Sequence, residues 1–184
     1  MFPVLETPRL VLRELVPTDA EALFEFRSDA EEQRHNDPPH TSVAESAALI
    51  ERLAAVRRET GATQWALTMK GEDVVIGLLG FNGWNRENHR ASMGYDLSRA
   101  MWGRGLMGEA VQAVLDHGFD VMGLNRIEAH TNDDNRSSIR MLRKLGFVRE
   151  GTFHDQFLED GRYHDVALFV MLRRNRPEAA VPSA

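Results

Sequence analysis

Three glycines at the start of an amphipathic stretch form the part of the sequence best suited to bind a ligand. The segment Trp102-Gly103-Arg104-Gly105-Leu106-Met107-Gly108-Glu109 lies between a strand-like run and a helix-like pattern. The first N–H groups of a helix lack partners within the helix and lie at the positive end of its dipole, so they attract anions. Glycines allow the backbone to come close to such a ligand. The segment therefore predicts a phosphate site, although glycines that serve only tight packing at a helix start would look the same.

The same glycines also match the G-x-G-x-x-G fingerprint of dinucleotide-binding proteins, through Gly103, Gly105 and Gly108. Glu128 even follows Gly108 by 20 residues, where a ribose-binding acid is expected. We reject this interpretation because Ser98–Met101 separates the loop from its strand, and because Glu128 lies inside a strand rather than at its end. The chain also lacks repeated strand–helix units. A Walker loop is excluded, since no Gly-Lys pair occurs.

Other candidate chemical groups do not assemble into a known catalytic pattern. His154-Asp155 and His164-Asp165 each place a base beside a carboxylate, but neighbours on a strand point to opposite faces, so neither pair is expected to act together. We find no coherent hydrolytic triad and no metal-ligand spacing in the sequence. The chain contains no cysteine, which excludes disulfides, thiolate metal sites and a cysteine thioester intermediate. If this chain moves an acyl group, direct transfer to the acceptor is the simpler expectation.

Hydrophobic periodicity predicts an α/β fold around the glycine segment. Strands are predicted at residues 9–15, 63–69, 74–84, 90–97, 126–131, 147–158 and 163–172, and helices opening at residues 17, 42, 105 and 135. Only the strand–helix–strand unit from Arg90 to Thr131 requires a parallel pair of strands. We therefore expect a mixed, mostly antiparallel sheet of about seven strands flanked by about four helices.

Local signals mark several boundaries between these elements. Ser42 is predicted to cap a helix with Glu45 as its capping-box partner, and Gly61 is predicted to end that helix. The polar residues Glu31–Thr41 are predicted to form a loop. The residues after Arg173 are rich in Pro and Ala, so we expect one domain over residues 1–173 and a disordered tail over residues 174–184.

Bulk composition narrows the class of function. Lys and Arg number 22 against 28 Asp and Glu, and the resulting net charge of −6 disfavours non-specific nucleic-acid binding. No apolar run approaches the roughly 20 residues that a membrane span needs. The N-terminal residues Met1–Glu6 lack the basic and long apolar regions of a signal peptide. We therefore expect a cytoplasmic protein without a nucleic-acid or membrane partner.

Several segments resemble the GNAT N-acetyltransferases, especially the RimJ/RimL-like branch of ribosomal-protein-type acetyltransferases. They are Gly94-Tyr95-Asp96-Leu97, Trp102-Gly103-Arg104-Gly105 with Glu109-Ala110, Asn135-Arg136-Ser137-Ser138-Ile139, and Leu145-Gly146-Phe147. The early run from Thr7 to Arg13 is also similar to the first strand of this branch. The resemblance covers nearly the whole chain and is strongest from about Ala91 to Leu172. It implies a single-domain GNAT-like α/β fold, direct transfer of acetyl from acetyl-CoA to a primary amine, and a homodimer.

The resemblance also implies a role for individual residues. The strand ending at Leu97 would pair its backbone with the pantetheine arm of CoA, and the acetyl group would lie where this strand and the strand 126–131 splay apart. Asn135 would contact the cofactor as well as cap a helix, although capping alone is the alternative. Ser138 would supply a proton to the departing CoA thiolate, although a serine at this helical position is also common without any catalytic role. Backbone N–H groups of the glycine segment would hold the pyrophosphate, namely those of Arg104, Gly105, Leu106, Met107 and Gly108.

The chain departs from the wider superfamily pattern at three positions. Trp102 replaces the usual Gln or Arg, as is common in the RimJ/RimL-like branch. Met107 replaces the usual Gly or Ala, which weakens the pyrophosphate assignment at that residue. Leu142 stands where many members carry a tyrosine acid, so a tyrosine acid at this position is excluded.

Acetyl transfer also requires a neutral amine, and the sequence does not identify the general base. An α-amine with a pKa of about 8 loses its proton more readily than a lysine amine with a pKa of about 10.4. Glu128 and His130 lie on one face of a strand, because their spacing is two, and Asp96 is a third candidate. A packed or solvated face is the favoured interpretation of the first two residues. A strand N–H near Leu97 could polarise the thioester carbonyl.

The sequence does not identify the acceptor amine, and it leaves two competing functions to be tested. The early polar residues His35, Asn36, Asp37 and His40 are predicted to select the acceptor, unless they form only a solvated connector. A protein N-terminus, a free amino acid and a small-molecule amine all fit. A non-catalytic CoA-binding sensor or interaction module is the main alternative, and a nucleotide-dependent oxidoreductase is the second. Acetyl-CoA would stabilise the enzyme and the sensor, whereas NAD(P) would stabilise only the oxidoreductase.

Overall fold

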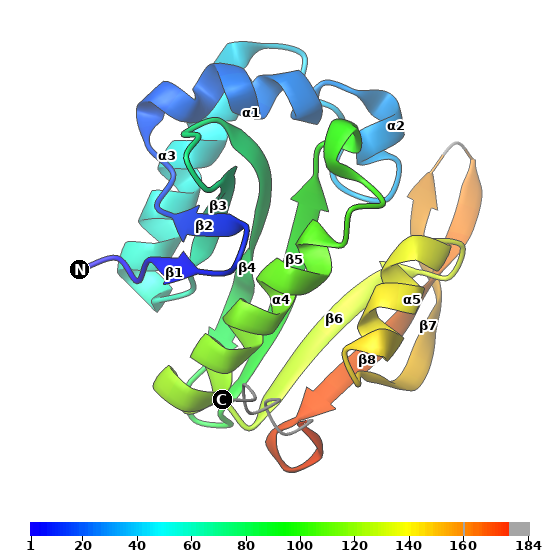
Figure 1. Cartoon of the computed structure of the whole chain (residues 1–184). Coiled ribbons are helices and arrows are strands. Elements are labelled where there is room, and N and C mark those ends of the chain that lie inside the picture. The colour runs from blue at the N-terminus through cyan, green and yellow to red at the C-terminus, as the bar shows by residue number, and fades with distance from the viewer. Residues whose placement is uncertain (160, 177–184) are drawn as a thin grey trace.

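The strands of the protein form one mixed sheet. The computed structural model describes residues 1–159 and 161–176, in which eight strands pair in the order β1-β2-β3-β4-β5-β6-β8-β7 (Figure 1). All neighbours are antiparallel except β5 and β6, which confirms the predicted parallel pair. The strands are β1 (Leu5–Glu6), β2 (Leu10–Arg13), β3 (Gln64–Met69), β4 (Val75–Asn85), β5 (Arg90–Leu97), β6 (Arg126–Asn132), β7 (Val148–Glu159) and β8 (Arg162–Leu172).

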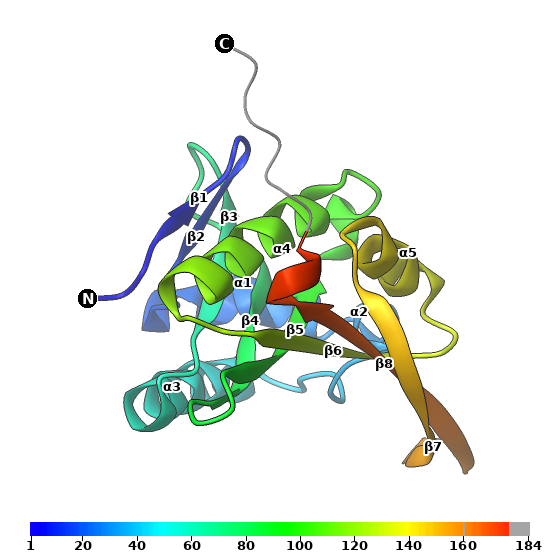
Figure 2. The ribbon, with the colours of Figure 1, turned by 90° about the horizontal axis from the view of Figure 1, so that it is seen from below.

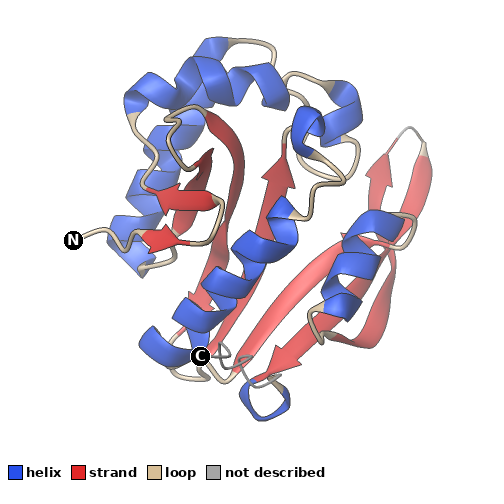
Figure 3. Ribbon diagram, in the orientation of Figure 1, coloured by secondary structure: helices blue, strands red, loops and turns tan. Residues whose placement is uncertain are grey.

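Helices cover both faces of this sheet (Figure 3). They are α1 (Ala20–Arg27), α2 (Ala30–Gln33), α3 (Val43–Thr60), α4 (Leu106–Asp116) and α5 (Arg136–Lys144). Figure 2 shows α4 and α5 on one side of the sheet and α3 on the other. A π-helical turn over His117–Val121 continues α4, and single 3-10 turns lie at Pro17–Asp19, Arg99–Met101 and Arg173–Asn175.

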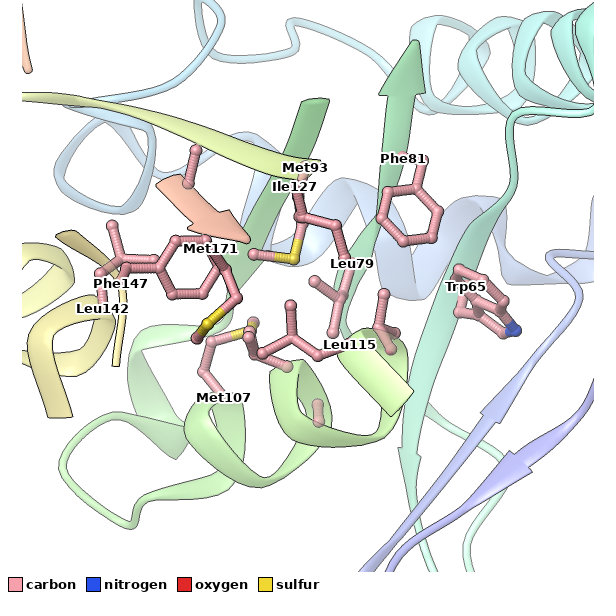
Figure 4. Packing of buried hydrophobic residues seen from close by; sticks show 14 of the residues in the cluster. Trp65, Leu79, Phe81, Met93, Met107, Leu115, Ile127, Leu142, Phe147 and Met171 are labelled. Atoms are coloured by element: carbon pink, nitrogen blue, oxygen red, sulfur yellow. The ribbon is translucent and has the colours of Figure 1, made fainter. Parts of the chain in front are cut away.

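Two hydrophobic cores lie on the two faces because strand residues alternate in direction. On β3, Trp65 and Leu67 belong to the core under α4, whereas Ala66 packs with Leu23 and Ile50 of α1 and α3. The first core is the larger one. In Figure 4, Met93, Met107 and Leu115 gather between α4 and the sheet, and Leu142 of α5 lies beside Phe147.

Two short elements were not predicted from the sequence. β1 adds a two-residue strand before β2, with Leu5 opposite Leu12. The segment 31–41 was expected to be a loop, but its first residues belong to α2. Asp29 begins this helix, because its carboxylate accepts hydrogen bonds from the backbone N–H groups of Glu31 and Glu32 at 2.8 and 3.3 Å. A single helical turn carries no apolar period, so the pattern could not reveal it.

The longer helix α3 begins and ends where its signals indicated. Ser42 accepts a hydrogen bond from the Glu45 N–H, and Gly61 ends the helix with a φ of 78°. The Glu45 carboxylate binds the backbone N–H and the hydroxyl of Thr41 rather than the N–H of Ser42, so the predicted capping box is shifted by one residue. Within the predicted tail 174–184, residues 177–184 lie outside the described part of the chain. Arg176 pairs with Asp116 and Asp120.

Candidate active site

The sheet divides beside β5, and this division creates the site. β5 and β6 pair only over Arg90–Met93 and Arg126–Ala129. Beyond Met93, β5 continues to Leu97 along β4, whereas β6 continues to Asn132 along β8. The last residues of β5 therefore have no strand on their β6 side, and Figure 1 shows the two strands diverging from each other.

Two clefts meet at this end of β5. The first, of about 800 Å³, lies between the end of β5, the start of α4 and α5. The second, of about 490 Å³, is lined by residues of α1 and α3, including Arg27 and Arg52. Both clefts share the residues His35, Asn36, Asn82, Gly94, Tyr95 and Asp96. The two clefts therefore adjoin each other at the end of β5.

The glycine segment forms one wall of the first cleft. Gly103 and Gly105 have φ values of 73° and 74°, a conformation that favours glycine, and Gly105 occupies the position before the first turn of α4. The first N–H groups of α4 have no partner within the helix, and the anion site expected there stays a prediction. The residues predicted to bind the cofactor that line this cleft are Leu97, Gly105, Leu106, Met107, Gly108 and Asn135. Arg104 is not among the lining residues.

An ion pair between Arg9, near the start of the chain, and Glu109 of α4 holds this loop in place. It was not predicted from the sequence. Arg9 binds the Glu109 carboxylate through its backbone N–H and its Nε at 2.8 and 2.7 Å, and it donates to the Arg104 carbonyl at 2.9 Å. The Thr7 hydroxyl donates to the same carboxylate. Burial alone would raise the pKa of Glu109, but the hydrogen bonds from Thr7 and Arg9 outweigh it and lower this pKa. Arg9 thus offsets a negative charge in the first turn of α4, where an anionic ligand would bind.

Trp102 connects the loop to β5. Its indole N–H donates a hydrogen bond to the Leu97 carbonyl at 2.7 Å. This bond links the residue before the first glycine to the last residue of β5.

Ser138 lies at the edge of the first cleft and bonds to a tyrosine that the sequence did not single out. The Ser138 Oγ is 2.6 Å from the Tyr95 hydroxyl, and the side chain of Ser138 is buried. Burial raises the pKa of Tyr95 to about 12, against a smaller lowering by the hydrogen bond with Ser138. The Asn135 Oδ1 accepts hydrogen bonds from the Ser138 N–H at 3.1 Å and the Ser137 hydroxyl at 2.9 Å, so Asn135 caps α5 as predicted.

The three candidate bases differ in position. Asp96 lines both clefts and forms a buried ion pair with Arg27, whose Nε lies 2.9 Å from Oδ2. Burial raises the pKa of Asp96 even though Arg27 acts to lower it. His130 lines the first cleft. Glu128 lines neither cleft and instead pairs with Arg126 at 2.5 Å and Arg90 at 3.9 Å, which leaves it poorly placed to accept a proton from a substrate.

The other residues singled out in the sequence fall in different places. His35 and Asn36 line both clefts and Asp37 lines the second, but His40 lines neither and bonds to Ser46 at 2.8 Å. Leu142 is fully buried in the core rather than exposed to the cleft (Figure 4).

The histidines of the β7–β8 hairpin do not act with their sequence neighbours. His154 bonds to Asp165 on the facing strand at 2.8 Å, and His164 stacks on Phe157. Over residues 1–159 and 161–176, no group of three or more His, Asp or Glu side chains is arranged to hold a metal ion.

Comparisons with known proteins agree with this geometry. The family described as "Acetyltransferase (GNAT) domain" matches residues 9–148. The "Uncharacterized N-acetyltransferase p20" of Bacillus licheniformis is 40% identical over 171 residues, which covers 92% of this chain and 96% of that protein. The ribosomal protein uS5-alanine N-acetyltransferase of Escherichia coli (strain K12) is 28% identical over 173 residues, with 89% and 88% of the two chains covered.

The fold is also shared with a solved structure. RimL, a ribosomal L7/L12 alpha-N-protein acetyltransferase in complex with coenzyme A, superposes with a TM-score of 0.85 at 24% identity, covering 92% of this chain and 98% of that one. None of the helices in the described part of this chain combines the length and apolar character needed to cross a bilayer.

Proposed function

The chain belongs to the GNAT acetyltransferase family and is an N-acetyltransferase that uses acetyl-CoA, and we propose that it joins its two substrates across the end of β5. In this proposal acetyl-CoA occupies the first cleft and the acceptor amine occupies the second. The observation that carries it is the meeting of the two clefts at Gly94, Tyr95 and Asp96, where the strand has no neighbour on its β6 side.

We propose that the glycine segment holds the pyrophosphate of CoA. Backbone N–H groups from Arg104 to Gly108 supply the donors, and for Arg104 only the backbone would contribute. The free side of β5 up to Leu97 pairs with the pantetheine arm, because unpaired strand groups need hydrogen-bond partners. Asn135 contacts the cofactor from the start of α5. A strand N–H at the end of β5 polarises the thioester carbonyl.

Ser138 is the proposed proton donor to the departing thiolate. Its burial at the edge of the first cleft and its hydrogen bond to Tyr95 support this role. Of the candidate bases, Asp96 and His130 stay in the proposal because both line the first cleft, and Asp96 also lines the second. Glu128 is left out because it contacts neither cleft.

The proposed acceptor is a primary amine, either the α-amine of a protein N-terminus or that of a small molecule. The names of two similar proteins support the first, since one acts on an alanine of ribosomal protein uS5 and the other on the alpha-amine of L7/L12. An α-amine also needs less help to lose its proton near neutral pH than a lysine side chain.

The test is to measure release of the free CoA thiol with a panel of peptides and small amines. The peptides begin with different residues, and each has an N-terminally blocked control that retains its side chains. We expect release to require a free α-amine or a small primary amine. Binding of acetyl-CoA by calorimetry without thiol release from any amine would contradict the enzyme and favour the CoA-binding sensor. Failure to bind acetyl-CoA would contradict both.

We further propose that the acetyltransferase domain spans residues 1–173, that the protein is cytoplasmic, and that it forms a homodimer. The exposed apolar side chains of Phe153 and Leu158 on β7 support a contact between copies. Light scattering on the wild-type protein should give twice the monomer mass. A Leu158→Glu variant should shift this mass toward that of the monomer if β7 forms the contact.

A further inference from the structure

Tyr95 and Ser138 form a hydroxyl pair across the gap in the sheet. Tyr95 comes from β5, Ser138 comes from the first turn of α5, and 2.6 Å separates their oxygens. Both residues line the first cleft. Because β6 has left β5 by this point, the pair is a direct link between the two elements on either side of the proposed thioester position.

The direction of this hydrogen bond decides what Ser138 can do. A hydroxyl has one proton to donate and can accept two hydrogen bonds. If Ser138 donated to Tyr95, its only proton would point away from the cleft. A phenol is a far stronger acid than an aliphatic alcohol, so Tyr95 is the natural donor of the pair. The Ser138 oxygen then accepts, and its proton is free to point toward the substrate.

The acidity of Tyr95 shows that it does not itself supply the proton. Burial raises the pKa of its hydroxyl to about 12. Taking cysteine as a reference, a thiol has a pKa of about 8.5, so a charge left on the Tyr95 oxygen after proton transfer to the thiolate would be unfavourable by more than about a thousandfold, and a charge left on the Ser138 oxygen still more so. The proton that Ser138 passes to sulfur must therefore be replaced from solvent as it leaves. Tyr95 therefore stays protonated through the reaction. Its contribution is a permanent hydrogen bond to the Ser138 oxygen, which strengthens the donation by Ser138.

We infer that Tyr95 is a positioning residue, which holds the Ser138 hydroxyl with its proton directed at the sulfur of acetyl-CoA. The inference rests on the proposed role of Ser138. During transfer the C–S bond breaks and its electron pair moves to sulfur, which gains a proton through Ser138. As it gives up its own proton, Ser138 takes up another from solvent, and the new amide nitrogen loses one proton to the base, so the changes balance and both hydroxyls end protonated.

The first test is the variant Tyr95→Phe, which removes only the hydroxyl. We expect kcat to fall about tenfold, as for the loss of one hydrogen bond in the transition state, while the KM values for acetyl-CoA and the amine change less than about twofold. Tyr163→Phe is the matched control, because Tyr163 is the other tyrosine of the chain and is exposed at the start of β8. It should keep wild-type kcat. A wild-type kcat for Tyr95→Phe would overturn the inference.

The second test asks whether Tyr95 acts through Ser138. In the Ser138→Ala background, Tyr95→Phe should lower kcat no further, because its partner oxygen is already gone. Two effects that multiply would show that Tyr95 acts independently and would overturn the inference. If the wild-type protein itself releases no CoA thiol with any amine, the proposed function fails instead, and the two failures are distinguishable.

The third test does not depend on activity. In the Tyr163→Phe protein Tyr95 is the only tyrosine, so tyrosinate absorbance reports its ionisation alone. We expect ionisation near pH 12, and at higher pH after Ser138→Ala, because Ser138 turns to donate to the phenolate once Tyr95 is ionised and this bond lowers the pKa. Ionisation of the folded protein near the ordinary value of about 10 would contradict the burial of Tyr95, and no response to Ser138→Ala would contradict the hydroxyl pair.

Discussion

Ser138 is one of the few polar side chains that the fold buries beside the first cleft. Ser138→Ala keeps the Asn135 cap, which uses the backbone N–H, so the start of α5 should stay intact. We expect kcat to fall by about 10- to 100-fold with little change in the affinity for CoA. Steady-state kinetics and calorimetry measure the two quantities separately. An unchanged kcat would remove Ser138 from the mechanism.

His117 makes stability depend on pH. Its ring packs edge-on against Trp65 with the centroids 5.5 Å apart, and burial lowers its pKa. The unfolded chain therefore binds a proton at His117 more readily than the folded protein does. The stability that neutral His117 contributes is complete above its unfolded-state pKa of about 6.5, and it is lost as the pH falls toward the lower pKa of the folded state.

We therefore expect Tm to drop between about pH 7.5 and 5.5, and to drop less in His117→Phe, which keeps an aromatic ring but cannot be protonated. His40, whose pKa burial also lowers, is present in both proteins, so part of the slope should persist. Equal slopes in differential scanning calorimetry would contradict the assignment.

The sequence reveals single residues of the site where their partners are local. Asn135 and Ser138 are three residues apart, and the glycine segment is continuous, so their positions followed from motif and helix geometry. Tyr95 and Arg9 could not be found in this way, because their partners lie 43 and 100 residues away along the chain. Which residues become neighbours across the sheet depends on strand order, and periodicity carries no information about it.

Among the elements, β3 and β4 come unusually close at Gly80. A Cβ at this position would collide with the Thr63 carbonyl oxygen and lie 2.5 Å from the Gln64 Cα. Both are backbone atoms, so the strands would have to separate. Gly80→Ala should destabilise the protein by about 1–3 kcal/mol, measured by urea denaturation.

Gly83 provides the control on the same strand. A Cβ there meets only the Ser92 Oγ, at an ordinary 3.5 Å. Gly83→Ala should change stability by less than about 0.5 kcal/mol. Similar losses in both variants would show that strand propensity, rather than close approach of backbones, decides the cost at Gly80.

The contacts of Arg9, which lies just before β2, with Glu109 of α4 predict a defect in cofactor binding rather than in the chemical step. Arg9→Met would leave the Glu109 carboxylate uncompensated beside the proposed pyrophosphate site. We expect the KM for acetyl-CoA to rise about tenfold at nearly constant kcat. Lys70→Met is the control, since Lys70 is about as exposed as Arg9 and pairs with Glu6 at 3.1 Å, away from the proposed cofactor site. An unchanged KM in Arg9→Met would show that the contacts of Arg9 with Glu109 do not support cofactor binding.

The long elements were predictable because each carries a clear period or boundary signal. The parallel pair followed from the strand–helix–strand unit, and Gly61 marked the end of α3. β1 and α2 were missed because two and four residues are too few to show a period. The depth of the split beside β5 was also hidden, since no residue pattern records where a strand loses its neighbour.

At the scale of the whole molecule, ligand binding should raise the free energy of unfolding. At about 100 times its Kd, acetyl-CoA should stabilise the folded protein by about 2.7 kcal/mol, which for a chain of this size corresponds to a Tm increase of about 5 to 10 °C. NAD and NADP at the same concentration should have no effect. Equal stabilisation by a dinucleotide would contradict the cofactor assignment.

The two clefts meet at β5, but the first is lined by α4 and α5 and the second by α1 and α3, so the proposed placement gives each substrate its own site. Neither reactant lies in the other's path, so donor and acceptor can reside on the protein together and each can exchange with solvent on its own. Turnover should then proceed through a ternary complex. Double-reciprocal plots for the two substrates should intersect instead of running parallel, and desulfo-CoA should compete with acetyl-CoA alone.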